Sequence, residues 1–323
     1  MKNSMQYSKS STNILPNDQN ALAALAGQTF LITGANGMLG RAFKKQLEEY
    51  VPSAVVYSLG KDVLDVRDPM SLAACDVLRP NFVLHCAGLV DADRCEVSPS
   101  EGRLSIVDGT RNVLEFSRRC NARILYPQSF LIYGDTEPII DEQTLPSPLS
   151  VYGNLKLEAE QLILTHAKDS LSIRMAGFFG GNSIDNNFVG RIIPHISKLL
   201  QQGVTTIDIG NRVWQPTYTE DLAANCLLLL ATQKSGLYCM ASHGSASFYE
   251  LTIEILRIIG IVDDINVQCV DAAILAAKEK ARRPSSAIML NRRLQREGLD
   301  RQRPWQISLA EYLNQPYFKD FFQ

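Results

Sequence analysis

Short apolar runs alternate with amphipathic stretches through the first half of the chain, from residue 28 onward. The apolar runs predict buried strands at TFLIT (29–33), AVVYSL (54–59), FVLHCAG (82–88) and ARILYPQS (122–129). Helices are predicted between them, at MLGRAFKKQLEEY (38–50), DPMSLAACDVLR (68–79) and GTRNVLEFSRRC (109–120). Strict alternation of strand and helix predicts right-handed βαβ units. We therefore expect an α/β fold with a Rossmann-like, doubly wound parallel sheet.

The pattern changes after residue 175, where a Gly/Asn-rich segment, GFFGGNSIDNNF, is followed by three predicted helices. These helices lie in RIIPHISKLLQQG (191–203), YTEDLAANCLLLLATQ (218–233) and FYELTIEILRIIG (248–260). We expect a smaller, discontinuous C-terminal lobe that binds substrate. The predicted division is a flexible tail at 1–26, a nucleotide-binding domain at 27–175 plus about 205–235, and the substrate lobe at about 176–204 plus 236–323. Within the tail, NALAALAG (20–27) is a candidate for a short helix against the body.

Composition and charge exclude several classes of protein. The formal net charge is −2, so no basic excess indicates a nucleic-acid partner. Seven cysteines without a Cys-x-x-Cys pair predict neither a zinc site nor a disulfide framework, and four histidines show no metal-ligand spacing. The longest apolar run, in CLLLLATQ, is too short to cross a membrane, and the polar first 26 residues do not resemble a signal peptide. We expect a cytoplasmic protein without a metal.

Three glycines stand three residues apart between the first predicted strand and helix. Glycine permits a sharp turn with positive φ and lets the backbone approach a pyrophosphate, which lies at the positive end of the helix. A glycine-rich turn without a ligand is the alternative interpretation. The predicted phosphate-binding residues are Gly34, Gly37, Met38, Leu39 and Gly40.

The end of the second predicted strand bears on the choice of cofactor. An NAD enzyme of this fold places an acidic residue there to bind the ribose. The chain instead reads YSLGKD, with no acid at the strand's end. Ser58 and Lys61 are suited to a 2′-phosphate, and Arg41 is a further candidate. We therefore predict NADPH as the cofactor, with NADH as the alternative.

A tyrosine and a lysine lie four residues apart in SVYGNLKLEAEQL, a predicted helix at 150–162. Tyr152 and Lys156 therefore share one helix face. We expect the lysine ammonium to lower the phenol pKa and make Tyr152 a proton donor or acceptor. Such a pair also occurs by chance, but Ser129 ends the preceding strand 23 residues earlier. Its hydroxyl can bind a substrate oxygen where charge develops.

These motifs resemble those of the extended short-chain dehydrogenase/reductase superfamily, which shares the glycine spacing and the Ser–Tyr–Lys set. Within it, four stretches resemble the dTDP-4-dehydrorhamnose reductase family, and the likeness runs from about residue 28 to 314. They are RPNFVLHCAGLVDADRCEVSP (79–99), PSPLSVYGNLKLEAE (146–160), VWQPTYTEDLA (213–223) and ARRPSSAIMLNRRL (281–294). The Pro-Thr turn and the Arg-Pro segment discriminate best, because the glycines and the triad are common to the superfamily.

The resemblance implies a reaction and roles for particular residues. NADPH is expected to reduce the 4-keto group of a nucleotide-linked deoxysugar, with Tyr152 giving the proton and Ser129 orienting the carbonyl. Arg283 and Asn187 are expected to bind the sugar nucleotide, although a surface role for Arg283 and a loop-capping role for Asn187 stay open. The implied cofactor contacts also include Tyr152, Lys156 and five further residues: Asp65, Val66, Cys86, Ala87 and Gly88.

One departure from the family keeps other functions open. Family reductases carry Asp and Tyr after the catalytic Ser/Thr, whereas this chain has Phe130 and Leu131. The lack of an Asp–Glu pair there disfavours a 4,6-dehydratase. The alternatives are a nucleotide-sugar epimerase or dehydrogenase with tightly bound NAD, and a non-catalytic NADP-binding regulatory subunit like the β subunit of methionine adenosyltransferase. A homodimer is also left open.

Overall fold

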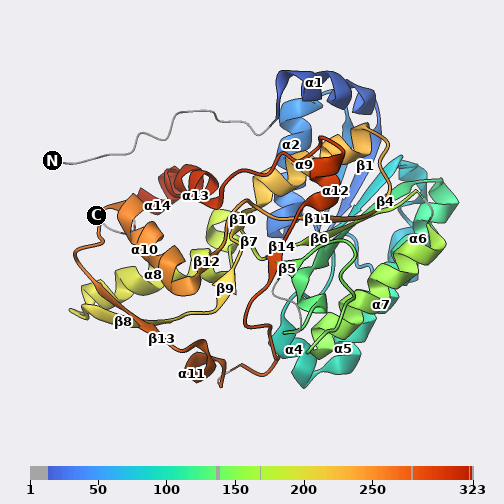
Figure 1. The fold of residues 1–323 in the computed structure, drawn as a ribbon. Coiled ribbons are helices and arrows are strands. Elements are labelled where there is room, and N and C mark those ends of the chain that lie inside the picture. The colour runs from blue at the N-terminus through green and yellow to red at the C-terminus, as the bar shows by residue number, and fades with distance from the viewer. Residues whose placement is uncertain (1–13, 136–138, 168, 278, 320, 322–323) are drawn as a thin grey trace.

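Six parallel strands form the main sheet, in the order β11-β6-β4-β3-β1-β2 (Figure 1). The computed structural model describes residues 14–135, 139–167, 169–277, 279–319 and 321. The strands are β1 (Thr29–Thr33), β2 (Val55–Leu59), β3 (Phe82–His85), β4 (Arg123–Ser129), β6 (Leu171–Met175) and β11 (Gly236–Met240). This sheet confirms the predicted Rossmann-like architecture and the four strands expected in the first half of the chain.

Helices cover both faces of the main sheet (Figure 1). On one face lie α2 (Met38–Tyr50) and α9 (Thr219–Ala231), and on the other lie α6 (Gly109–Cys120) and α7 (Val151–His166). Two short helices, α4 (Ala92–Val97) and α5 (Pro99–Arg103), precede α6. The helix expected at 68–79 is shorter than predicted: α3 (Pro69–Ala73) ends and a 3₁₀ turn (Asp76–Leu78) follows.

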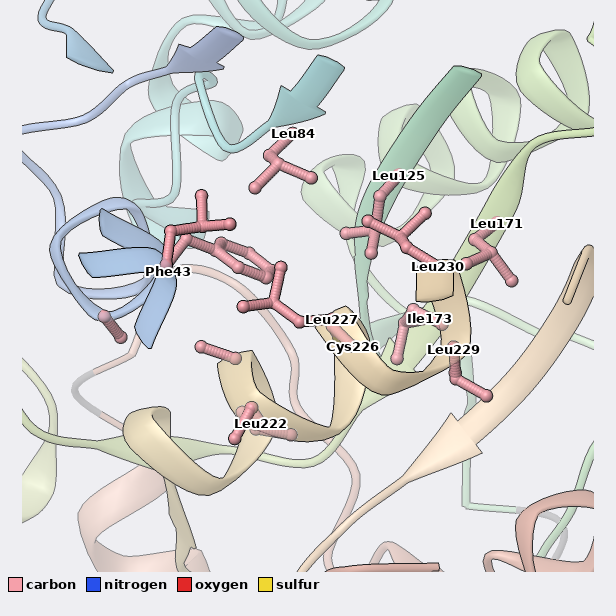
Figure 2. Close-up of a cluster of buried hydrophobic side chains, with 14 of the residues drawn as sticks. Phe43, Leu84, Leu125, Leu171, Ile173, Leu222, Cys226, Leu227, Leu229 and Leu230 are labelled. Carbon is pink, nitrogen blue, oxygen red and sulfur yellow. The ribbon is translucent and has the colours of Figure 1, made fainter. Parts of the chain in front are cut away.

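The core under α2 and α9 is built largely from leucines. Figure 2 shows Leu222, Leu227 and Leu230 of α9 together with Phe43 of α2 and leucines of the neighbouring strands. Helix α9 is apolar almost all round, which is the pattern of a helix enclosed by protein rather than one that faces solvent. No helix among the residues described is both long and apolar enough to traverse a bilayer.

The smaller lobe has its own hydrophobic core and lies beyond the carboxyl ends of the main strands (Figure 1). Its helices are α8 (Phe188–Gln201), α10 (Phe248–Ile259), α13 (Trp305–Leu313) and α14 (Pro316–Lys319), with short α11 (Ala272–Ala276). Strand β8 (Thr206–Gly210) pairs with β13 (Asn266–Val270). The short strands around it pair as β7 (Phe178–Phe179) with β10 (Thr217–Tyr218), and β9 (Val213–Trp214) with β12 (Ala246–Ser247).

The chain crosses between the lobes at positions that differ from the predicted boundaries. Residues 206–210 were expected in the nucleotide-binding domain, but β8 pairs with β13 in the smaller lobe. Residues 236–240 were expected in the smaller lobe, but β11 pairs with β6 and becomes an edge of the main sheet. The chain returns once more through α12 (Arg292–Arg296), which packs on β11, after β14 (Ile288–Met289) has paired with β5 (Ile139–Ile140).

The predicted flexible tail is wrong for residues 14–26, where the alternative of a short helix packed against the body is confirmed. Helix α1 (Pro16–Leu22) and a 3₁₀ turn (Ala23–Leu25) pack against α9, and the side chains of Leu22 and Leu25 are buried. An ion pair joins the carboxylate of Asp18 to the guanidinium of Arg301, with Nε at 2.6 Å. The cause is the apolar spacing in NALAALAG, which gives this segment a face to bury. Residues 1–13 lie outside those the structure describes.

A leucine truncation tests this anchoring. The Leu22→Ala substitution removes a side chain that is 1% exposed, so we expect a loss of about 2–5 kcal/mol in unfolding free energy. The matched control is Leu15→Ala, because Leu15 is 50% exposed, and we expect a change within about 0.5 kcal/mol. Urea denaturation of both variants provides the measurement. Equal stabilities for the two variants would contradict the packing of α1.

Candidate active site

The glycine loop joins β1 to α2 and approaches the end of β3. Gly34 has a φ of +64°, and a Cβ at this position would lie 2.7 Å from the backbone N of Ala87. A Cβ at Gly40 would lie 2.6 Å from the carbonyl oxygen of Gly34. Gly37 precedes the first turn of α2, whose leading N–H groups have no partner inside the helix. These backbone positions suit a phosphate, which needs close approach and free N–H donors.

The other predicted cofactor residues surround this loop. Met38 and Leu39 begin α2, and residues 86–88 follow β3, where Ala87 N donates to Thr33 Oγ1 at 3.2 Å. The hydroxyl of Ser58 on β2 is buried and has no hydrogen-bond partner. Lys61 and Arg41 are exposed. The structure therefore brings together loops after three adjacent strands, β2, β1 and β3, at one edge of the sheet.

An acidic residue near this edge was missed by the sequence analysis. Asp62 lies three residues beyond β2, and its carboxylate accepts a long hydrogen bond of 3.5 Å from the side-chain amide of Asn36 in the glycine loop. The signal was present in YSLGKD, but the acid was sought only at the strand's end. A carboxylate here is a candidate ligand for ribose hydroxyls and disfavours a 2′-phosphate, in opposition to Lys61.

Asp65 and Val66 are held by neighbouring residues. The guanidinium of Arg67 donates to both carboxylate oxygens of Asp65, with Nε at 2.9 and 3.0 Å, and lowers the pKa of Asp65 to about 2. Val66 is buried, and its carbonyl accepts from the side-chain amide of Asn112 at 2.9 Å. The contact of Asp65 with an adenine base stays a prediction.

Helix α7 closes tightly on the end of β4 and brings Tyr152 to Ser129. A Cβ at Gly153 would lie 2.3 Å from the carbonyl oxygen of Leu131, so only glycine permits this approach. Two side chains fix the start of the helix: Ser150 Oγ accepts from Gly153 N at 3.1 Å, and Glu96 Oε1 accepts from Val151 N at 2.7 Å. The role of Glu96, contributed by α4, had no signal in local sequence.

The pKa of Tyr152 differs from expectation. Burial raises it to about 12, against the opposing effect of a hydrogen bond with Ser129. The predicted lowering by Lys156 is wrong because the lysine is directed elsewhere. Its Nζ donates to the Pro127 carbonyl at 2.7 Å and lies 4.0 Å from the centre of the Tyr126 ring. Burial lowers the pKa of Lys156 to about 7, and the nearby Glu160 carboxylate opposes this shift. Tyr152 is thus a protonated phenol at neutral pH.

A buried network supports the backbone around these groups. The amide of Gln128 accepts from Ser129 N at 2.8 Å and donates to the Lys156 carbonyl at 2.9 Å, so it ties β4 to α7. Below it, Glu160 forms an ion pair of 2.7 Å with Arg174 of β6, and Arg174 donates to the Tyr133 hydroxyl at 2.6 Å. The sequence analysis missed this network, because its members lie on separate elements.

The apolar pair that departs from the family forms a 3₁₀ turn after β4. Ser129 Oγ accepts from Leu131 N at 3.2 Å and so caps the turn Phe130–Ile132. Phe130 packs against a buried cluster that includes Ile132 and Tyr133, whereas Leu131 packs towards α6 and α7. The two side chains therefore fill space around the site instead of offering polar groups to a ligand.

Two of the three predicted substrate residues, Asn187 and Arg283, already have protein partners. Asn187 Nδ2 donates to the Phe178 carbonyl at 2.7 Å. This hydrogen bond fits the alternative role for Asn187, in which its side chain stabilises the loop before α8. Arg283 Nη1 lies 3.2 Å from a carboxylate oxygen of Asp93 and 3.2 Å from one of Glu279. Arg212, which the sequence analysis missed, donates to Glu279 at 2.9 and 3.0 Å. Two arginines thus share one carboxylate between the lobes, and Arg283 is not a solvated surface residue.

This sheet, with its glycine loop and its adjoining Ser129 and Tyr152, is that of the extended short-chain dehydrogenases/reductases, and it classes the chain with their NAD(P)-dependent oxidoreductases. The model of the RmlD substrate binding domain matches residues 28–318, so the chain belongs to that family. Among the residues described, no group of three or more His, Cys, Asp or Glu side chains is placed to hold a metal ion.

Two relatives of similar sequence and one solved structure of similar fold extend the comparison. The chain is 28% identical over 289 residues to the dTDP-4-keto-6-deoxy-D-glucose reductase of Streptomyces niveus, covering 87% of this chain and 95% of that protein. It is 26% identical over 251 residues to the methionine adenosyltransferase 2 subunit beta of Xenopus tropicalis, covering 71% of each. The crystal structure of a dTDP-4-dehydrorhamnose reductase from Clostridium acetobutylicum superposes with a TM-score of 0.80 at 27% identity, covering 88% and 98%.

The buried lysine makes a testable prediction about pH. The pKa of Lys156 is about 7 in the folded protein against an ordinary value of 10.5 for a solvated lysine, so between these two pH values the unfolded chain binds one more proton than the folded protein. Stability therefore gains about 1 kcal/mol per pH unit from this group as pH rises above 7. We expect the difference in unfolding free energy between wild type and Lys156→Met to shift in favour of wild type by that amount from pH 7.5 to 8.5. A constant difference across this range would contradict the assigned pKa.

Proposed function

We propose that the protein reduces the 4-keto group of a nucleotide-linked deoxysugar with NADPH. The observation that carries this proposal is the contact of Ser129 with Tyr152 at the end of β4, next to a glycine loop fit for a dinucleotide. Membership in the RmlD substrate binding domain family and the similarity to named 4-keto-sugar reductases support the same reaction. The residues around the loop fit NADPH through their free backbone donors, the unpartnered Ser58 hydroxyl and Lys61.

In the proposed reaction each side chain has one task. When bound, NADPH supplies the hydride that the carbonyl carbon accepts. Ser129 donates a hydrogen bond to the carbonyl oxygen and orients it, and Tyr152 gives its phenolic proton to the oxygen as negative charge develops there. The raised pKa of Tyr152 keeps the phenol protonated before the reaction, which is the form that reduction requires. Lys156, whose ammonium is directed to the Pro127 carbonyl and not to the phenol, is proposed to bind the nicotinamide ribose of the cofactor.

Substrate binding is proposed to involve Arg283 and Asn187. A guanidinium binds a diphosphate through paired hydrogen bonds, and Arg283 lies at the junction of the lobes. To bind this group it exchanges Asp93 and Glu279 for phosphate oxygens, so the protein carboxylates hold the guanidinium in place before the ligand arrives. Asn187 contributes by fixing the Phe178 loop at the start of α8.

Two alternative functions differ from this proposal in their outcomes. An epimerase or dehydrogenase with tightly bound NAD would be purified with its cofactor and would consume no NADPH. A regulatory subunit would bind NADP and a partner protein without turnover, as the similarity to the methionine adenosyltransferase 2 subunit beta suggests. The retained Ser129–Tyr152–Lys156 set favours the reductase. We also propose a cytoplasmic location, in keeping with seven free thiols. Light scattering would decide whether the protein forms the homodimer that the sequence leaves open.

Removing the phenolic oxygen separates an enzyme from a binding protein. We expect Tyr152→Phe to lower kcat for a 4-keto sugar nucleotide by about 10²–10⁴-fold, because the substitution removes the proposed proton donor. The Kd for NADPH, measured by fluorescence titration, should stay within about threefold of wild type. Tyr249→Phe, in α10 of the smaller lobe, is the matched control and should retain full activity. Undiminished turnover in Tyr152→Phe would overturn the assignment of the proton donor.

Cofactor choice is decided by the loop after β2. We expect kcat/KM with NADPH to equal or exceed that with NADH, because Lys61 attracts the 2′-phosphate. The Lys61→Met substitution should lower the NADPH/NADH ratio, and Asp62→Asn should raise it by removing a repulsive carboxylate. Initial rates with both cofactors for the three proteins provide the measurement. A tenfold or greater preference of the wild type for NADH would make the proposal of NADPH untenable.

A further inference from the structure

Trp214 and Gly177 form an unusually close contact between the lobes. A Cβ built on Gly177 would lie 1.7 Å from the indole Nε1 of Trp214 and 2.4 Å from Cε2. No side chain is compatible with such distances, so the indole occupies the place that a side chain at 177 would need. Gly177 follows β6 in the main lobe, and Trp214 belongs to β9.

This contact lies at the carboxyl edge of the sheet, close to the proposed catalytic groups. Met175, the last residue of β6, stands opposite Ser129 in the strand register. The strand direction continues through Ala176, whose N–H donates to the Met240 carbonyl at 3.4 Å. Gly177 therefore lies two residues, or about 7 Å, beyond the position level with Ser129. The indole that covers Gly177 therefore lies just beyond the carboxyl end of β6, the strand that neighbours β4 and its terminal Ser129.

The indole ring of Trp214 packs against other aromatic rings, and its N–H group has no acceptor among the residues described. Trp214 is 7% exposed, and its ring lies 5.5 Å from that of Phe248, which stacks on Phe188 at 4.4 Å. Among the residues that the structure describes, none accepts a hydrogen bond from the indole N–H. This N–H is therefore available to a ligand that enters beside Gly177, and an indole N–H combines with an apolar ring to suit a partly polar ligand.

We propose that Trp214 forms a wall of the sugar subsite and donates its indole N–H to an oxygen of the substrate's sugar, with Gly177 leaving the space that this requires. The inference rests on the proposed function, since a sugar whose C4 reacts at Ser129 and Tyr152 must lie beside this wall. A flat aromatic surface suits the apolar face of a deoxysugar, which presents more C–H groups than its hydroxylated counterpart. Trp214 thus contributes to substrate selection and takes no part in proton transfer.

The chain has only two tryptophans, which makes a direct measurement practicable. In the Trp305→Phe variant, Trp214 is the sole source of indole emission. With NADP present, we expect titration with dTDP-, UDP-, GDP- or CDP-linked glucose to change this emission saturably for at least one of them. The corresponding free nucleoside diphosphate, which lacks the sugar, should produce less than half of that change. The Trp214→Phe variant, which retains Trp305, is the control and should show no saturable change.

Kinetics of variants supply the second readout. We expect Trp214→Phe, which keeps a ring but loses the N–H, to raise KM for the sugar nucleotide at least fivefold, while KM for NADPH and kcat stay within about twofold. Trp214→Ala should have a larger effect. If Trp305→Phe fails to fold, the difference in emission between wild type and Trp214→Phe gives the same information.

The outcomes separate the two proposals. Saturable binding by calorimetry with unchanged Trp214 emission and an unchanged KM in Trp214→Phe overturns the sugar wall and leaves the reductase standing. A saturable emission change without turnover of any 4-keto sugar supports the sugar wall and overturns the reductase. Absence of binding for all four sugar nucleotides overturns both.

Discussion

The approach of α7 to the turn after β4 determines the geometry of the whole site. Gly153 lets the helix backbone touch the Leu131 carbonyl, and this contact sets where the first two turns of α7 place Tyr152 and Lys156. A side chain at 153 would separate helix from strand and move the phenol away from Ser129. The partners at the start of the helix, Ser150 and Glu96, work to the same end, because they satisfy N–H groups that the helix itself leaves unpaired.

Burial around this contact has an electrostatic cost that the surrounding network limits. An ammonium inside a protein is unfavourable unless its surroundings supply acceptors, and Lys156 has the Pro127 carbonyl, the Tyr126 ring and the Glu160 carboxylate nearby. Glu160 in turn is paired with Arg174, which keeps the cluster close to neutral. The same burial that depresses the lysine pKa raises that of Tyr152, so the free protein holds the proton on the phenol.

The sequence predicted local structure well and distant partnerships poorly. Strand 29–33 and helices 38–50 and 109–120 match the structure residue for residue, because each is defined by its own apolar period and its flanking breakers. The glycine loop was predictable for the same reason. The joining of β11 to β6, the pairing of β8 with β13 and the ion pairs of Arg283 were not, since each depends on residues tens to hundreds of positions away. The predicted lowering of the Tyr152 pKa was also wrong, because a spacing of four residues does not show how deeply the phenol is buried.

The ion pair between Asp18 and Arg301 has a consequence for how the protein folds during synthesis. These two residues lie near opposite ends of the sequence. The main sheet gains its edge strand β11 only after Met240 has been synthesised. During synthesis the glycine loop and the first four strands can assemble early, but the sheet face that α9 (Thr219–Ala231) covers is completed only after Ala231 has been made, and the Asp18–Arg301 ion pair forms later still. A nascent chain therefore exposes the leucine-rich face of its sheet until α9 has been synthesised.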